Sequence, residues 1–510
     1  YDDTNERVES SLISKIDIDL NIAKGVDLKL EANVNQYNIN STATNISNSA
    51  DRLNGSYSIG HSEKFQHSLS AKMFFDKEIN EDIQMDLVLG GEMWSTESEF
   101  SNSSTSGGLK IRDFYNISNS KNAASASGGI GAVKKINSLY AFYNVSYKRD
   151  LYLSITARND WSSALVYPDG HGTKSYFYPS ASLGWVTSET FELPQFISFA
   201  KLRASYAIVG NDTDPYKLST GFVVDRFNAQ PDLNMFRYEN GQAVSTTLLP
   251  EKKYSLEAGF DLRMFDNRVK FDFTYYKDNN KNQIIGLPVP QESGISSQLI
   301  NAGNLQNQGV EVALDFRIIQ KDDWDWSIGI NGTRNRDKII SLAPGINEFY
   351  LFGDPGNANS STGTFAYVGG NYGDLATYRG YKYYEGSNTA NLGEKVLENR
   401  NNWSVAYASG FRNRDSLQVM GNMQADWYGG ANTSLRYKNF QLSALVDARF
   451  GGEMYSADLR YGMHQGVIQS SVANRDPEHG AISWVSQGMG QNQFGKTYTD
   501  GYIPEGVFPD

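Results

Sequence analysis

The chain has 510 residues and a formal net charge of −12, with no basic stripe, which argues against nucleic acid as a partner. It has no cysteine, which excludes disulfides, thiolate metal sites and cysteine nucleophiles. No run of residues reaches the roughly 18–20 apolar positions that a membrane-spanning helix needs. Abundant tyrosine, phenylalanine and glycine (31, 26 and 47 residues) with only 13 prolines favour a large β-protein.

Apolar and polar residues alternate with a period of two along most of the chain, as in residues 26–34 and 254–262. This period is typical of strands with one apolar face. We therefore predict fourteen strands, at residues 11–21, 26–36, 53–75, 83–95, 137–148, 151–160, 176–186, 199–209, 253–263, 268–277, 306–318, 324–334, 427–436 and 439–450.

The connections between these strands alternate between short and long. Short turns at one end and long loops at the other, over antiparallel strands with one apolar face, predict an all-β fold, a transmembrane antiparallel β-barrel. Trp324 and Trp326 beside a short turn, and Tyr206 and Tyr275 near the long loops, suit the two interfacial aromatic girdles of such a barrel. A soluble β-sandwich, with the aromatic side chains in its core, is the alternative.

Several sequence blocks, in this order, resemble the SusC/RagA family of TonB-dependent outer-membrane transporters of Bacteroidetes. They lie at residues 157–163, 178–185, 201–206, 209–212, 250–252, 256–259, 301–304, 309–311, 437–440 and 451–453. The resemblance implies a barrel of about 22 strands around a plugged lumen. Residues 1–510 would then be an incomplete barrel. We see in them no plug, no TonB-contacting segment and no final closing strands.

The chain offers no positive signal for catalysis, for a cofactor or for a resident metal. Asp212 and Asp214 could ligate calcium or could equally form an Asx turn before Pro215. Asp476 and Glu478 form a carboxylate pair, but in a loop such a pair is solvated more often than catalytic. We expect a protein that is not an enzyme.

Aromatic residues in the long loops are candidates for stacking on a sugar or for packing against a lid protein, and packing within the loop is the alternative for each. Our candidate substrate-binding residues are Tyr167, Tyr238, Tyr372 and Tyr381. Segment 335–426 is far longer than an ordinary loop. It is predicted to cover the pore mouth, to contact a partner or to contain an unrecognised hairpin.

The resemblance implies active import of a large nutrient, an oligosaccharide or a peptide, through the cell outer membrane. TonB–ExbB–ExbD would supply energy through a region outside residues 1–510, and a SusD-like surface lipoprotein would cap the barrel. The lipid bilayer and lipopolysaccharide would surround it. The alternatives are a passive porin and a surface glycan-binding or glycan-degrading β-protein. The substrate itself cannot be read from the sequence.

Overall fold

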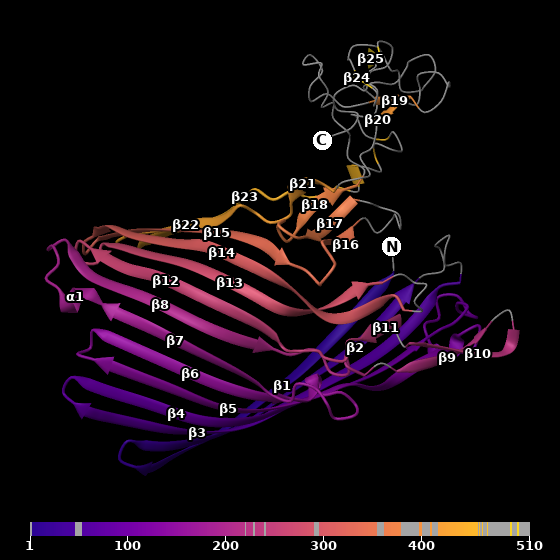
Figure 1. The fold of residues 1–510 in the computed structure, drawn as a ribbon, viewed down its shortest axis with the longest axis horizontal. Coiled ribbons are helices and arrows are strands. Elements are labelled where there is room, and N and C mark those ends of the chain that lie inside the picture. The colour runs from indigo at the N-terminus through magenta and orange to yellow at the C-terminus, as the bar shows by residue number, and fades with distance from the viewer. Residues whose placement is uncertain are drawn as a thin grey trace. The chain divides into compact units, whose positions relative to one another are not determined.

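The structure is a computed structural model, and it consists almost entirely of antiparallel strands (Figure 1). It describes residues 3–45, 54–219, 221–227, 230–238, 241–289, 295–353, 362–378, 397–399, 408–410, 417–456, 458–459, 462, 467, 490–491 and 497–498. Within these ranges, no helix combines the length and hydrophobicity that a membrane crossing requires.

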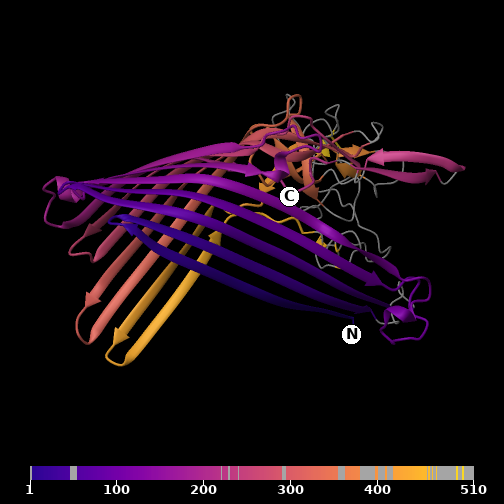
Figure 2. The same cartoon turned by 90° about the horizontal axis from the view of Figure 1, so that it is seen from below.

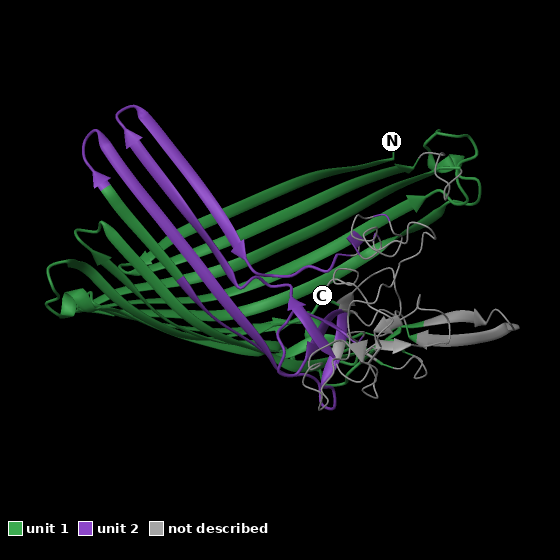
Figure 3. Cartoon of the chain, turned by 90° about the horizontal axis from the view of Figure 1, so that it is seen from above, with its two compact units in different colours: residues 1–304, 312–318 green, residues 305–311, 319–510 purple. Residues whose placement is uncertain are grey.

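The chain divides into two compact units, which Figure 3 shows in different colours. Unit 1 comprises residues 1–304 and 312–318, and unit 2 comprises residues 305–311 and 319–510. Strand β14 (Ser297–Gln320) is divided between them.

Unit 1 is built on ten antiparallel strands, and each pairs with the next of the ten. One of these pairs is joined by a long connection, residues 212–250. Figures 1 and 2 both show them side by side, in colours from indigo to magenta and pink. Their bounds are β1 (Thr4–Ala23), β2 (Val26–Asn45), β3 (Ser56–Asn80), β4 (Ile83–Ser104), β5 (Ser125–Tyr147), β6 (Leu151–Ser162), β7 (Tyr176–Val186), β8 (Ile197–Asn211), β12 (Glu251–Met264) and β13 (Val269–Pro288).

The connections of unit 1 carry smaller elements. Strands β9 (Phe222–Phe227) and β10 (Gln230–Tyr238) form a hairpin, and β11 (Gln242–Val244) pairs in parallel with the start of β14. The helices are short: η1 (Ile117–Asn119), η2 (Ser163–Leu165) and α1 (Thr187–Thr190).

Unit 2 contains the antiparallel strands β15 (Trp324–Ser341), β22 (Trp427–Tyr437) and β23 (Phe440–Phe450), paired in that order. A separate four-stranded sheet, the loop sheet, is formed by β16 (Glu348–Gly353), β17 (Thr362–Tyr367), β18 (Asp374–Thr377) and β21 (Gln418–Asn422). Two further short pairs are β19 (Leu397–Asn399) with β20 (Ala408–Gly410), and β24 (Gly490–Gln491) with β25 (Thr497–Tyr498).

Each of the fourteen predicted strands has a counterpart, but several strands are longer than predicted. β2 continues to Asn45 and β5 begins at Ser125, within segments that we predicted as long connections. The residues added to β2 are mostly polar and those added to β5 include three glycines, and the backbone groups of both pair with the neighbouring strand just as the predicted part does. A hydropathy pattern marks only the part of a strand where apolar and polar residues alternate, so it does not detect these extensions.

Segment 335–426 contains the loop sheet. The alternative that this segment holds an unrecognised hairpin is therefore confirmed, since β16 and β17 pair as antiparallel strands. These strands are only 4–6 residues long, and the turn between β17 and β18 contains Gly369, Gly370 and Gly373. So short an alternation does not stand out in one sequence.

Candidate functional site

The register of unit 1 sorts its side chains into an apolar and a polar face. Ile16, Ala32, Leu69 and Met93 are successive cross-strand partners on β1 to β4. The residues one position away point to the opposite side, because successive side chains of a strand alternate. The corresponding row of cross-strand partners on the opposite face is polar, and its members are Asp17, Glu31, Ser70, Glu92, Ser138 and Asp160.

Arg158 on β6 is the centre of a hydrogen-bond network on the polar face. Its Nε donates to Asp160 Oδ1 at 2.8 Å, and its Nη2 donates to Ser138 Oγ at 2.7 Å and lies 3.4 Å from Glu92 Oε2. The hydroxyl of Tyr178 on β7 donates to the other oxygen of Asp160. The network therefore links four strands, β4 to β7, and leaves the buried Asp160 carboxylate with partners on both oxygens.

Asp212, which directly follows β8, is held by residues that are distant in sequence. Lys134 Nζ lies 2.5 Å from its Oδ1, and the Ser162 hydroxyl donates to its Oδ2. Lys134 also donates to the carbonyl of Thr213 at 3.1 Å. These contacts occupy the carboxylate that was our candidate calcium ligand. In the described part of the chain, no group of three or more histidine and carboxylate side chains could hold a metal ion.

Glu31 forms a third charge cluster on β1 to β3. It pairs with Lys72, and its Oε1 lies 3.1 Å from Lys15 Nζ, while the Ser70 hydroxyl donates to Oε2 at 3.3 Å. The glutamate side chain is 9% exposed. Lys29 Nζ also lies 3.8 Å from Oε1, so three lysines and a hydroxyl offset the cost of removing this charge from water.

A polar pocket of about 330 Å³ lies among β6, β7, β8, β12 and β13. The Arg203 guanidinium on its wall makes a two-pronged contact with Asp272, at 2.7 and 2.6 Å. Lys201, Glu257 and Thr274 also line this pocket. Because charged groups and hydroxyls on this face pair with one another, the face can contact water without a large local excess of charge of one sign.

Tyr167, one of the four candidate tyrosines, lies inside a small loop core with Leu218, Leu248 and Leu299 and is 8% exposed. Its ring stacks on His171 at 4.1 Å between centroids. Its hydroxyl donates to the carbonyl of Ser245 and accepts from the Leu248 N–H at 2.9 Å. This position favours packing within the loop over contact with a ligand.

The structure does not bring the other candidates together. Tyr238 is half-buried against Phe222 in the β9–β10 hairpin, with 4.8 Å between ring centroids. Tyr372 is 44% exposed in the turn before β18. Tyr381 lies outside the described residues, as do Asp476 and Glu478.

The loop sheet has a polar cluster of its own around the buried Asp374. Its Oδ2 accepts from the Tyr367 hydroxyl at 2.7 Å and from the Asn371 N–H at 2.8 Å, and its Oδ1 accepts from Asn422 Nδ2 at 2.8 Å. Burial, together with the hydrogen bond to Asp374, raises the pKa of Tyr367 to about 12. The cluster fixes the turn that presents Tyr372.

Sequence reasoning did not single out Arg158, Asp160, Tyr178 or Lys134 as a group. Arg158, Asp160 and Tyr178 do lie in the blocks 157–163 and 178–185 and have polar-face parity. The sequence does show that charged residues recur at polar positions of neighbouring strands. It does not show the pairing register, which is needed to know which of these residues meet.

Comparisons with known proteins give a consistent result. A sequence model of the family described as "TonB dependent receptor-like, beta-barrel" matches residues 1–447. TonB-dependent receptor P3 of Formosa agariphila is 28% identical over 340 residues, which are 63% of this chain and 32% of the relative. TonB-dependent receptor SusC of Bacteroides thetaiotaomicron is 24% identical over 62% of this chain and 32% of its own length.

The chain therefore spans about a third of the length of these two curated relatives. Among solved structures, the RagAB peptide transporter matches with a TM-score of 0.71 and 19% identity, over 90% of this chain and 50% of that one. The "closed-closed" state of the RagAB peptide importer gives 0.72 over 94% of this chain and 52% of that one, again at 19% identity. At this identity the structural likeness supports the fold.

Proposed function

The chain belongs to the family of TonB-dependent receptor-like β-barrels, and we propose that it forms the wall of an outer-membrane transporter that imports a large nutrient with energy from TonB. The observation that carries the proposal is the two-faced antiparallel sheet of unit 1. One face is apolar, and the other carries charges that are paired across strands. A membrane barrel needs this combination, because its outer face contacts lipid and its inner face contacts water.

Strand length supports a membrane crossing. A transmembrane strand needs about 9–11 residues, and the apolar alternation of β2 covers residues 26–34. Strands β1 to β5 have 20–25 residues, which is twice that length. We infer that their polar halves project beyond the bilayer and support the long loops.

The cargo class and partners form part of the proposal. The relatives suggest an oligosaccharide or a peptide, since one similar structure is described as a peptide transporter. We infer that a SusD-like surface lipoprotein caps the barrel, and that TonB–ExbB–ExbD acts through a plug in the whole protein. Of the four candidate tyrosines, Tyr372 presents the most exposed described ring. It is our proposed contact for cargo or for the lipoprotein.

The test is uptake by cells that carry the full-length gene. Labelled oligosaccharides and labelled peptides are supplied to cells with the gene, without it, and with the gene but without TonB. We expect uptake of one cargo class that requires both the gene and TonB. A Tyr372→Ala variant should raise the half-saturating cargo concentration severalfold, because loss of an interfacial aromatic anchor commonly costs more than about 1 kcal/mol.

The same experiment separates the alternatives. Gene-dependent uptake that persists without TonB would identify a passive porin. A full-length protein that stays in the aqueous phase without detergent would be a surface glycan-binding protein instead.

A further inference from the structure

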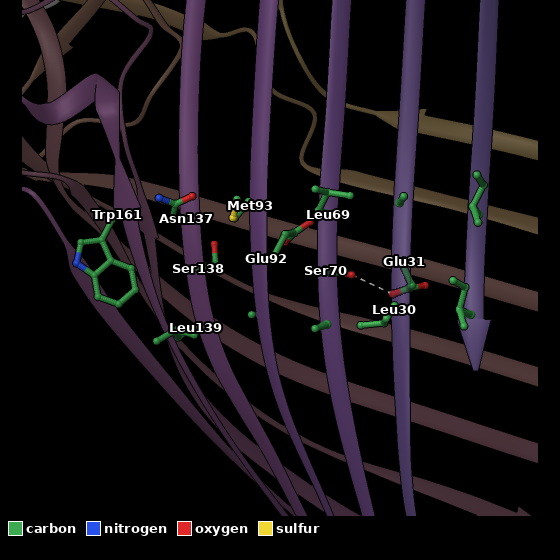
Figure 4. A pocket seen from close by; sticks show the side chains of 15 residues that line it. Leu30, Glu31, Leu69, Ser70, Glu92, Met93, Asn137, Ser138, Leu139 and Trp161 are labelled. Atoms are coloured by element: carbon green, nitrogen blue, oxygen red, sulfur yellow. Dashed lines mark hydrogen bonds between the residues drawn. The ribbon is translucent and has the colours of Figure 1, made fainter. Parts of the chain in front are cut away.

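The apolar face of unit 1 is hollowed by a groove of about 780 Å³ that runs across β1 to β6 (Figure 4). We call it the outer-face groove. Its apolar lining includes Leu30, Leu69, Met93, Leu139 and Trp161. Glu31, Ser70, Glu92 and Ser138 also border it, but their positions in the register place their side chains on the polar face.

The groove owes its depth to small residues on three adjacent strands. Ala32 on β2, Ala71 on β3 and Gly91 on β4 form its floor, and Ala71 is the direct cross-strand partner of Gly91. A Cβ at Gly91 would lie 3.3 Å from Leu139 Cδ2, so the glycine keeps this space open. Large side chains at Leu69, Met93 and Leu139 border the floor, so the apolar surface is hollowed between them.

One end of the groove is polar. Asn137 on β5 pairs with Trp161 on β6, and both line the groove. Asn159 lies on the same face, opposite Leu139. Tryptophan with carboxamides is typical of the height at which hydrocarbon meets lipid headgroups.

Lys135 supplies a positive charge at that end. It precedes Asn137 by two residues, so it lies on the same face and further from the short turn. It is exposed, and among the described residues it has no ion-pair partner. Its neighbour Lys134 points to the polar face, where Asp212 binds it. A lysine beside the apolar outer-face groove suits a lipid whose anionic headgroup contacts the lysine while its acyl chain lies in the groove.

We propose that the outer-face groove is a binding site for one phosphate-bearing lipid of the outer leaflet, with an acyl chain along Ala32, Ala71 and Gly91 and a phosphate at Lys135. The proposal rests on the outer-membrane location proposed above. A general lipid annulus would need neither the hollow nor the charge beside it. The occupant is an amphiphile, because the groove is apolar along Ala32, Ala71 and Gly91 and has Asn137 at one end, with Lys135 two residues beyond it on the same face.

The test uses full-length protein extracted from the outer membrane and native mass spectrometry with added lipid A, or with lipid A from which the phosphates have been removed. We expect one lipid A to bind in preference to the dephosphorylated form. Lys135→Gln should lower the affinity for lipid A about fivefold, the effect of one basic residue near an anionic headgroup, and should leave the dephosphorylated form unaffected. Ala71→Leu should weaken the binding of both lipid forms, because the larger side chain fills the outer-face groove.

Two matched variants act as controls. Lys64→Gln removes a lysine from the polar face of β3, and Ala181→Leu adds the same bulk to the apolar face of β7 outside the groove. Both should bind lipid A as the wild type does. Equal binding by all variants, or an adduct that proves to be a second protein chain, would overturn the proposal. An effect of Ala71→Leu alone would overturn the phosphate contact.

Failure of this proposal can be told apart from failure of the proposed function. A protein recovered from the outer membrane without a groove-dependent lipid retains its role as a membrane barrel and loses only the lipid site. A protein recovered from the aqueous phase loses both.

Discussion

The buried Asp160 carboxylate accepts hydrogen bonds from Arg158 and from Tyr178. Asp160→Ala would leave a half-buried guanidinium and a tyrosine hydroxyl without their acceptor. We expect a loss of about 1–3 kcal/mol in the free energy of unfolding, because buried polar groups that lose a partner cost about that much. The temperature at which the detergent-solubilised full-length protein loses its heat-modifiable gel mobility reports this loss.

A matched control for that substitution lies two strands away. Asp86 on β4 is half-buried, and its strand position places it on the same face as Glu92. Asp86→Asn should leave the transition within a degree or two of the wild type. Equal shifts for the two variants would mean that the Arg158 network adds no specific stability.

His171 gives the loops a pH dependence that can be stated with its sign. Its Nδ1 faces the Asp169 carboxylate and its Nε2 lies 3.2 Å from the carbonyl oxygen of Thr246. Both neighbours are acceptors, so the protonated ring satisfies both. The hydrogen bond to Asp169, and then that to Thr246, raises the pKa of His171 above its ordinary value of 6.5.

The contribution of His171 to loop stability is therefore complete below pH 6.5 and is lost as the pH rises through the raised pKa. The pKa of Asp169 is lowered, first by the backbone N–H of His171 and then by its ring, so its contribution is lost only on strong acidification. We expect residues 245–248 to exchange backbone hydrogen faster at pH 8 than at pH 6, after correction for intrinsic rates. A His171→Gln variant should show no such difference, and a difference that persists in it would assign the effect to another group.

At the scale of elements, two adjacent glycines on β4 differ in whether a Cβ would fit at their position. A Cβ at Gly90 would lie 2.2 Å from Tyr140 Cε2, within the ring that packs over it, whereas a Cβ at Gly91 would lie 3.3 Å from Leu139 Cδ2 and 3.6 Å from the Ser138 carbonyl oxygen. Tyr140 is 9% exposed, and the Arg158 guanidinium lies over its ring at 5.3 Å. Gly90 is therefore required by the packing of the polar face.

We expect Gly90→Ala to destabilise the barrel by about 1–3 kcal/mol, because overpacking forces a ring and its neighbours to move. Gly91→Ala, one residue away on the open apolar face, should cost less than about 1 kcal/mol. Heat-modifiable mobility compares the two variants directly. The opposite order would contradict the assignment of the two faces of β4.

Strand boundaries at this scale were predicted well only where hydrophobicity alternates. The start of β7 at Tyr176, the start of β22 at Trp427 and the end of β23 at Phe450 agree with the prediction. Asn45 at the end of β2 was missed. Its segment, residues 37–45, is rich in asparagine, serine and threonine, and pairing with the partner strand keeps it extended.

At the scale of the whole molecule, unit 2 shows how a barrel strand carries a folded loop. Asp337 near the end of β15 accepts from the Tyr372 N–H at 2.8 Å and from Gln424 Nε2 at 3.3 Å, and these residues flank β18 and β21. The Ile339 N–H also donates to the Gly370 carbonyl at 2.8 Å. The loop sheet is thus tied to the strand by a few polar contacts.

Asp337→Ala should weaken this attachment by about 1–3 kcal/mol, since it leaves the Tyr372 N–H without its acceptor. Hydrogen exchange should become faster in β18 and β21 and stay unchanged where β15 pairs with β22. Lys338→Ala, an exposed neighbour on the same strand, is the control and should change neither region. Faster exchange along β15 and β22 would show that loop and wall unfold together.

The sequence pattern alone predicted the fourteen strands of the described wall, their antiparallel order and their two faces. These follow from a local period of two and from the length of connections, which one chain displays directly. Its sequence blocks also indicated the family. The contact of Lys134 and Ser162 with Asp212 arises from the tertiary fold, as does the packing of Tyr167 inside a loop while Tyr372 is exposed. The pairing register joins residues dozens of positions apart, and no local pattern encodes that distance.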